Sequence, residues 1–186
     1  MAGYGFKPVG GIDGRPYNGG TQRCVVLGAD TTDLYVGDFV RLAGSGTATG
    51  VPDVTKVAAT EVIYGAIVSI EPLEAASALW IDGSEVAVDR YVNVAVATDG
   101  MLFACHPTSA IAKTNIGAMG DIVVVAGAAP FYTSKSTLSA TLTTSAAQLQ
   151  LVGFVQNDKD ATSATADLIV RVAEPQIGGA TASVGV

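Results

Sequence analysis

The chain has 186 residues, of which 49% are hydrophobic and 15% charged, and its net charge at pH 7 is −7. This length suits one domain whose core needs no disulfide. Nucleic-acid binding depends on clustered cations, and the ten Lys and Arg residues never form a run, so no nucleic-acid partner is expected. An average domain carries roughly 25% charged residues. Much of this surface must therefore be neutral, either covered by a partner or solvated by hydroxyl groups.

Residues 1–20 combine seven glycines and two prolines with three aromatic residues. Glycine and proline at this density disfavour regular structure, whereas disordered leaders are depleted in aromatic rings. Two interpretations follow. Either the rings fold back onto the chain's own core, or the segment is an arm that docks Phe6, Pro8 and Tyr17 on a neighbouring molecule. No basic region followed by an apolar core is seen, so a signal peptide is not expected.

From residue 22 onward the pattern is that of β-strands, first "QRCVVLG" and then "DLYVGDFVRL" at 33–42. Apolar residues alternate on one phase on either side of the Gly37-Asp38 pair. This pair interrupts the run, as a bulge or a sharp bend does. We predict that the bend carries the strand from one sheet into the next.

Further short strands follow, separated by turn signals. Residues 90–105 predict a hairpin with its turn at Thr98-Asp99-Gly100, because Asp-Gly between alternating apolar runs favours a tight turn. Residues 109–121 have helical character that glycine limits to a turn or two. Residues 133–147 are a linker or an exposed hydroxyl-rich strand. Other strands are expected at 61–71, 121–127, 149–156 and 166–174.

Strands at a spacing of roughly 8–12 residues predict an all-β fold, a compact β-barrel or β-sandwich. We expect an extended Gly-rich N-terminal arm, a C-terminal tail and at most one or two short helical turns. The expected division is an arm at 1–20, a β domain at 21–175 and a tail at 176–186. The longest charge-free apolar stretch, at 122–132, is too short to span a bilayer, so no membrane partner is expected.

The sequence contains only weak patterns for a metal site or a catalytic nucleophile. His106 is the only histidine in the sequence, and no cysteine pair accompanies it, so neither a metal nor a cofactor is expected. Nucleophilic catalysis needs an oriented base beside a Ser or Cys, and no motif of this kind surrounds His106. Residues 157–167 resemble a calcium loop but lack its central Gly and closing Glu.

Three acidic residues in "WIDGSEVAVDR", Asp82, Glu85 and Asp89, have the composition of paired catalytic carboxylates. The alternative, purely structural interpretation is a solvated loop beside Trp80, whose ring fills a core or an interface. The sequence favours that interpretation, and the chain is not expected to be an enzyme.

The two cysteines, Cys24 and Cys105, each lie inside an apolar strand-like run. Buried free thiols are typical of such positions. A disulfide between them is an alternative that no pattern favours.

The order of these segments resembles that of the decoration, or cement, proteins that coat the heads of tailed bacteriophages. The resemblance covers about residues 5 to 175, and its order is more specific than any single piece. The matching pieces are "GFKPVGG", "DLYVGDFVRL", "VIYGAIVSIEP", "YVNVAVATDGMLFAC", "NIGAMGDIVVVAG", the Ser/Thr-rich stretch, "LQLVGFVQ" and "DLIVRVAEP". The segment "WIDGSEVAVDR" matches nothing typical of these proteins.

The resemblance implies a structural virion protein that is made in the host cytoplasm and binds the outer surface of the capsid. Its implied partners are the major capsid protein and other copies of itself, as a trimer or a dimer. Phe6, Pro8 and Val9 would belong to the adhering arm, and Gly37 and Asp38 to the strand bend. The alternatives are another virion component, such as a head fibre or tail tube subunit, and an SH3-like or OB-like binding module.

Overall fold

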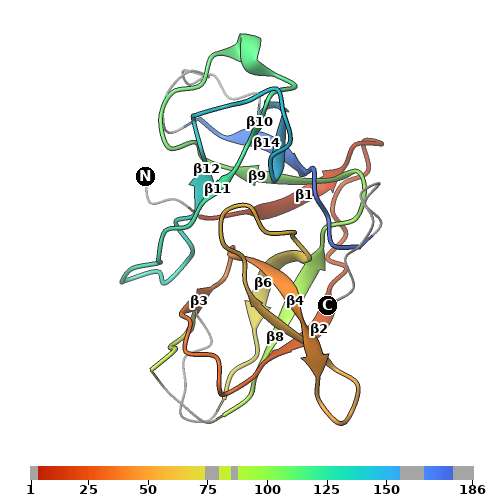
Figure 1. The fold of residues 1–186 in the computed structure, drawn as a ribbon, viewed down its shortest axis with the longest axis vertical. Coiled ribbons are helices and arrows are strands. Elements are labelled where there is room, and N and C mark those ends of the chain that lie inside the picture. The colour runs from red at the N-terminus through yellow and green to blue at the C-terminus, as the bar shows by residue number, and fades with distance from the viewer. Residues whose placement is uncertain (1–3, 74–79, 85–87, 156–165, 178–186) are drawn as a thin grey trace.

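The computed structural model describes residues 4–73, 80–84, 88–155 and 166–177, and within them the fold is almost entirely β (Figure 1). This confirms the predicted all-β class with a compact barrel. The elements are β1 (Lys7–Gly11), β2 (Gln22–Val26), β3 (Leu34–Tyr35), β4 (Phe39–Gly46), β5 (Pro52–Lys56), β6 (Gly65–Ile70), β7 (Trp80–Ile81), β8 (Arg90–Val96), β9 (Met101–Cys105), the 3₁₀ turn η1 (Lys113–Asn115), β10 (Met119–Gly120), β11 (Ile122–Val123), β12 (Thr137–Leu138), β13 (Leu149–Phe154) and β14 (Leu168–Val172).

Five strands form a closed barrel in the order β2-β5-β4-β6-β8, the lower half of the molecule in Figure 1. Their side chains alternate between the barrel interior and the outside, as the pleat of a strand requires. The interior is filled by apolar groups from all five strands, together with Leu34 and Ile81 of the small β3–β7 sheet. Closure removes the exposed edges that an open sheet would leave.

A second sheet, in the order β1-β9-β14-β13-β10, lies above the barrel. A second apolar core fills the space between the two halves and takes residues from both. At its centre Phe39 of the barrel stacks on Phe6, with ring centroids 4.1 Å apart, and meets the edge of Phe103 at 5.1 Å. The two halves therefore share this second core, which we call the shared core and which is separate from the core inside the barrel.

The predicted hairpin at 90–105 is wrong in its pairing, although the turn at residues 98–100 forms. The Met101 amide donates to the Thr98 carbonyl at 3.0 Å, and Gly100 takes a φ of +90°. However, β8 pairs with β2 and β6, whereas β9 pairs with β1 and β14. Closure of the barrel occupies both edges of β8, so the chain crosses at this turn into the second sheet.

At Gly37-Asp38 the chain turns out of the β3–β7 sheet and enters the barrel as β4. The Asp38 amide donates to the Tyr35 carbonyl at 3.0 Å, and Gly37 takes a φ of +92°. A Cβ at Gly37 would lie 2.5 Å from the Tyr4 carbonyl oxygen. Both the left-handed backbone and this close approach require glycine.

The carboxylate of Asp38 is fully buried and joins three separate segments. Its Oδ2 accepts from the Lys56 ammonium at 2.9 Å and from the Tyr35 amide at 3.1 Å. Its Oδ1 accepts from the hydroxyl groups of Ser134 and Ser136 at 2.5 and 3.2 Å. These bonds connect the barrel to the segment that leads into β12. Such partners offset the large cost of burying a charge.

Two buried glutamines reinforce the same junction. Gln148 donates to the carbonyl groups of Ala58 and Glu61 at 2.9 and 2.6 Å, and accepts from the Ile122 amide at 3.1 Å. Gln176 accepts from the Leu42 amide at 2.6 Å. Each buried side chain thereby finds hydrogen-bond partners in the backbone of a distant segment.

We predict that Asp38→Ala lowers the free energy of unfolding by about 3–5 kcal/mol, because it leaves the Lys56 ammonium buried without its counter-ion. Urea denaturation measures the loss. The matched control is Asp13→Ala, which removes an ion pair exposed to solvent at 3.2 Å from Arg15 and should cost less than about 1 kcal/mol. Equal losses in the two variants would contradict the role assigned to Asp38.

Candidate interaction surfaces

The N-terminal segment folds onto the chain itself, which corrects the prediction that Phe6 docks on a neighbouring molecule. Phe6 is only 1% exposed and stacks on Phe39 in the shared core. Its amide donates to the Gly37 carbonyl at 2.8 Å. Of the two interpretations of these aromatic residues, folding back onto the core is the one that holds for Phe6, because this apolar ring completes the interior.

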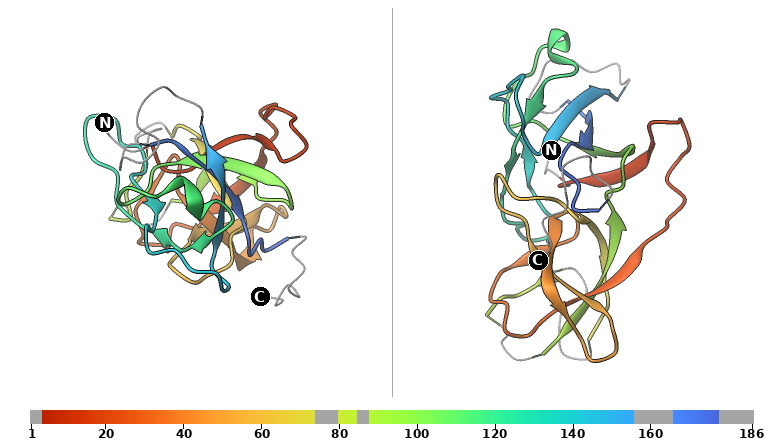
Figure 2. Two further views of the ribbon diagram at one scale, coloured as in Figure 1. Left: turned by 90° about the horizontal axis from the view of Figure 1, so that it is seen from above. Right: turned by 45° about the vertical axis from the view of Figure 1, so that its right-hand side comes forward.

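Residues 7–17 form a projecting element, which we call the N-terminal hairpin (Figure 2, right). Its first strand, β1, is an edge strand that pairs with β9. Its tip is closed by bonds from the Gly11 amide to the Arg15 carbonyl at 2.8 Å and from the Tyr17 amide to the Val9 carbonyl at 3.1 Å. The Ile12 amide donates to the Gly100 carbonyl at 2.8 Å, which ties the tip to the β8–β9 turn. The hairpin is therefore held in one conformation before any partner arrives.

The hairpin presents apolar groups to solvent. Ile12 at the tip is 62% exposed and Val9 is 36% exposed. Pro8 and Tyr17, the other predicted arm residues, are partly buried. Ile12 was not among the predicted contact residues; its place at the centre of "GGIDG" is the signal that could have identified it.

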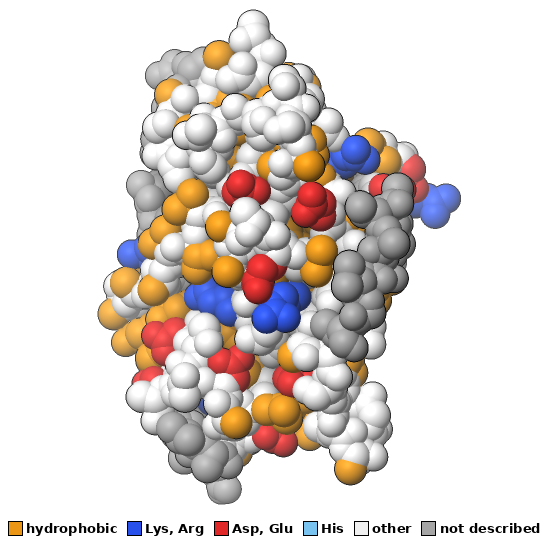
Figure 3. Space-filling view, in the orientation of Figure 1, with side chains coloured by type: hydrophobic (Ala, Val, Ile, Leu, Met, Phe, Trp, Pro, Cys, Tyr) orange, Lys and Arg blue, Asp and Glu red, His pale blue; other side chains and the backbone are white. Residues whose placement is uncertain are grey.

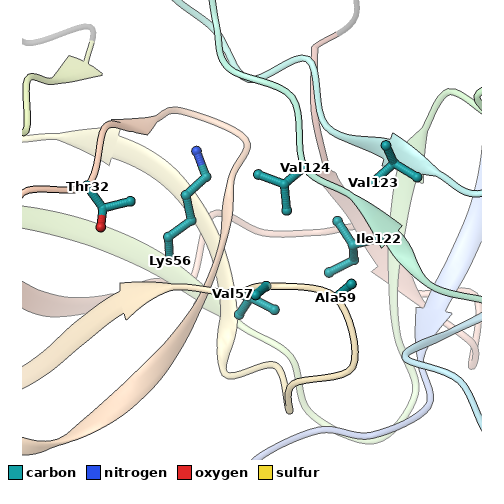
Figure 4. Close-up of a pocket in the computed structure, with 8 residues that line it drawn as sticks. Thr32, Lys56, Val57, Ala59, Ile122, Val123 and Val124 are labelled. Carbon is teal, nitrogen blue, oxygen red and sulfur yellow. The ribbon is translucent and has the colours of Figure 1, made fainter.

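A second surface is a groove at the junction of the two halves (Figure 4). This seam groove has a volume of about 520 Å³ and is lined by Thr32, residues 56–59 and residues 122–124. Among the described residues that line it, Lys56 is the charged one, and its ammonium is bound to the Asp38 carboxylate and to the Asp33 carbonyl at 3.0 Å. The groove therefore presents mainly aliphatic groups to a ligand.

Residues 123–131 continue from one wall of the seam groove into a projecting segment, which we call the apolar loop (Figure 1, blue-green at left). Three successive valines at 123–125 are exposed, and Phe131 is 67% exposed. Residues 122–134 contain no charged side chain. Hydrophobic groups gather along the same side of the molecule in Figure 3. Exposed apolar patches of this kind mark interaction sites.

Trp80 holds the base of the apolar loop. Its ring is parallel to those of Tyr35 and Tyr132, with centroids 5.5 Å away in each case. Gly127 lies so close to the Tyr35 ring that a Cβ there would be 2.5 Å from it. This assigns Trp80 a structural position that the sequence had left open. Parallel aromatic contacts add to the stability that burial alone provides.

His106 lies at the end of β9 beside Asp167, rather than in an open loop. Its Nδ1 is 3.5 Å from Asp167 Oδ1 and 3.3 Å from the Ala166 carbonyl oxygen. The Tyr4 hydroxyl donates to the same carboxylate at 2.8 Å. Burial, together with this carboxylate, raises the pKa of Tyr4. The group links the start of the chain to β9 and to the segment before β14, and we assign it a structural role.

The described acidic residues near Trp80 accept hydrogen bonds, Asp82 within its own turn and Asp89 from a distant segment. Asp82 accepts from both the amide and the hydroxyl of Ser84, at 2.8 and 2.6 Å, and these bonds lower its pKa. Asp89 accepts from the Gly28 amide at 3.0 Å. Glu85 and residues 157–165 of the calcium-like loop lie outside the described residues.

Within the described part of the chain, no three His, Cys, Asp or Glu side chains are grouped as a metal ion would require. Nor does any helix in the same residues have the length and apolar character needed to cross a membrane.

Both cysteines are buried and free. Burial raises the pKa of the Cys24 thiol to about 11, and it also raises the pKa of Cys105. Cys24 packs inside the barrel and Cys105 in the shared core, so the two thiols belong to different clusters.

Comparisons of the chain with protein-family models, with curated proteins and with solved structures find no match.

We predict that neither thiol reacts with an aromatic disulfide reagent at pH 8 while the protein is folded, because the reactive species is the thiolate. Burial disfavours that form at both positions. In denaturant, absorbance should report two thiols per chain. A fast-reacting thiol in the native protein would contradict the burial of Cys24 or Cys105.

Proposed function

We propose that this chain is a structural virion protein that binds the outer surface of a tailed-phage capsid and stabilises contacts between capsid subunits. The order of its sequence segments supports this proposal, and so does a weakly charged, all-β fold with two apolar projections. The observation that carries it is the N-terminal hairpin, which is braced by hydrogen bonds and exposes Ile12 at its tip and Val9 on its first strand.

The hairpin has the physical properties that a shell-binding element needs. A preformed element loses little conformational entropy on binding. Complete burial of one large aliphatic side chain contributes about 1.5–3 kcal/mol, so a single hairpin binds weakly. Copies that associate with one another present several hairpins together, and the effective affinity then rises by multivalency. The proposed partners are therefore the major capsid protein and other copies of this chain.

The five-stranded barrel also suits a second candidate, an SH3-like or OB-like binding module. Such barrels bind single-stranded nucleic acid through cationic and aromatic faces. The net charge of −7 opposes that use, which leaves a protein or peptide ligand. A head fibre or tail tube subunit is the remaining alternative and differs from a cement protein in copy number.

The test adds the purified protein to capsids that lack it and measures its copy number against the major shell protein on a quantitative gel. We expect a ratio within a few-fold of one to one. Ile12→Asp should weaken binding at least about tenfold, because it removes the apolar contact and places a charge there.

The matched control is Ile116→Asp, which changes a residue of similar exposure beside η1, away from the hairpin. This variant should bind like the wild type. A handful of copies per particle would favour a fibre or tail component, and no binding to any capsid would overturn the proposal.

A further inference from the structure

The apolar loop ends in a projecting aromatic side chain that its own chain does not cover. Phe131 is 67% exposed, although the neighbouring backbone is fixed. The Tyr132 amide donates to the Ala128 carbonyl at 3.1 Å, and the Tyr132 ring lies against Trp80. We call this exposed Phe131 ring the knob, because a large apolar group held in water by a braced loop is suited to insertion into an apolar groove.

The seam groove is an apolar hole of a size that suits such a ring. Its lining is formed by short aliphatic side chains, among them Val57, Ala59 and Val124, and its volume of about 520 Å³ accommodates a phenyl ring with its flanking residues. Phe131 is not among the lining residues, because the loop starts at the groove wall and leads away from it. A second copy can supply the ring that the first copy cannot.

The exposed ring and the groove belong to one chain, and the distribution of charge allows a second copy to be the occupant. Each copy carries a net charge of −7, so two copies repel one another over most approaches. The loop from 122 to 134 has no charged residue, and Asp38 neutralises the one cation of the groove. At this pair of surfaces two copies meet without placing one acidic group against another, and the neutral loop matches the neutral groove.

We propose that residues 128–131 of one copy insert Phe131 into the seam groove of a second copy. Knob and hole are different surfaces of one chain, so copies join either reciprocally in a two-fold dimer, with each Phe131 in the groove of the other copy, or head to tail in a ring when the rotation between copies permits. The contact goes beyond capsid binding: it joins copies to each other and does not involve the N-terminal hairpin.

The test uses two variants that each lose one side of the contact. Phe131→Asp removes the knob and keeps the groove, whereas Ala59→Arg blocks the groove and keeps the knob. Both positions are exposed, so the fold should persist, which circular dichroism and thermal melting verify. We expect the wild type to form a defined oligomer in light scattering coupled to size exclusion, and each variant alone to be a monomer.

An equimolar mixture of the two variants retains one intact contact, between the knob of Ala59→Arg and the groove of Phe131→Asp. We therefore expect a one-to-one heterodimer and nothing larger. Ile116→Asp, the control used above, should keep the oligomer of the wild type. The mixture is also measured at about 1 M salt, which screens an ion pair between the two introduced charges, so that association that persists there reports insertion of the ring.

Two results would overturn the inference. The first is a wild type that stays monomeric at the highest soluble concentration. The second is a mixture that stays monomeric. If the wild type is monomeric and Ala59→Arg also loses capsid binding, the shell protein occupies the groove in place of a second copy. Capsid binding by a monomer would leave the proposed function standing, whereas an oligomer without capsid binding would leave this contact standing.

Discussion

The buried carboxylate of Asp38 is the interaction on which the arrangement of the two halves depends. It sits at the turn where the chain enters the barrel, and it accepts hydrogen bonds from Lys56, Ser134 and Ser136. A charge in this position is tolerated only when its partners are all in place. The network therefore holds the segment before β12 against the end of β5. The positions of residues 56–59 and 122–124, which line the seam groove, follow from this contact.

The same network explains why a groove that contains a lysine behaves as an apolar surface. The Lys56 ammonium points toward Asp38 and the Asp33 carbonyl, which leaves its methylene groups to line the groove. Long cationic side chains commonly divide in this way between an apolar stem and a polar head. Electrostatic pairing inside the junction thus determines the chemistry presented outside it.

The N-terminal hairpin and the apolar loop lie on opposite sides of the molecule (Figures 1 and 2). This separation allows one side to contact another copy while the other side contacts a shell. Each projection is braced at its base, the hairpin by pairing of β1 with β9 and the loop by the rings around Trp80. Rigid presentation of a few apolar groups suits binding by many identical weak contacts.

By itself, the sequence determined the all-β class, the bend at Gly37-Asp38 and the strands that became β13 and β14, because alternation and turn residues act over a few positions. Only the tertiary structure decided that β8 and β9 part into different sheets and that Ser134 becomes a buried partner of Asp38. Likewise, Phe6 and Phe131 are alike as residues, yet one fills the core and the other projects. These outcomes depend on which strand edges and cavities remain when distant segments of the chain pack together. A local sequence pattern does not determine how distant segments pack.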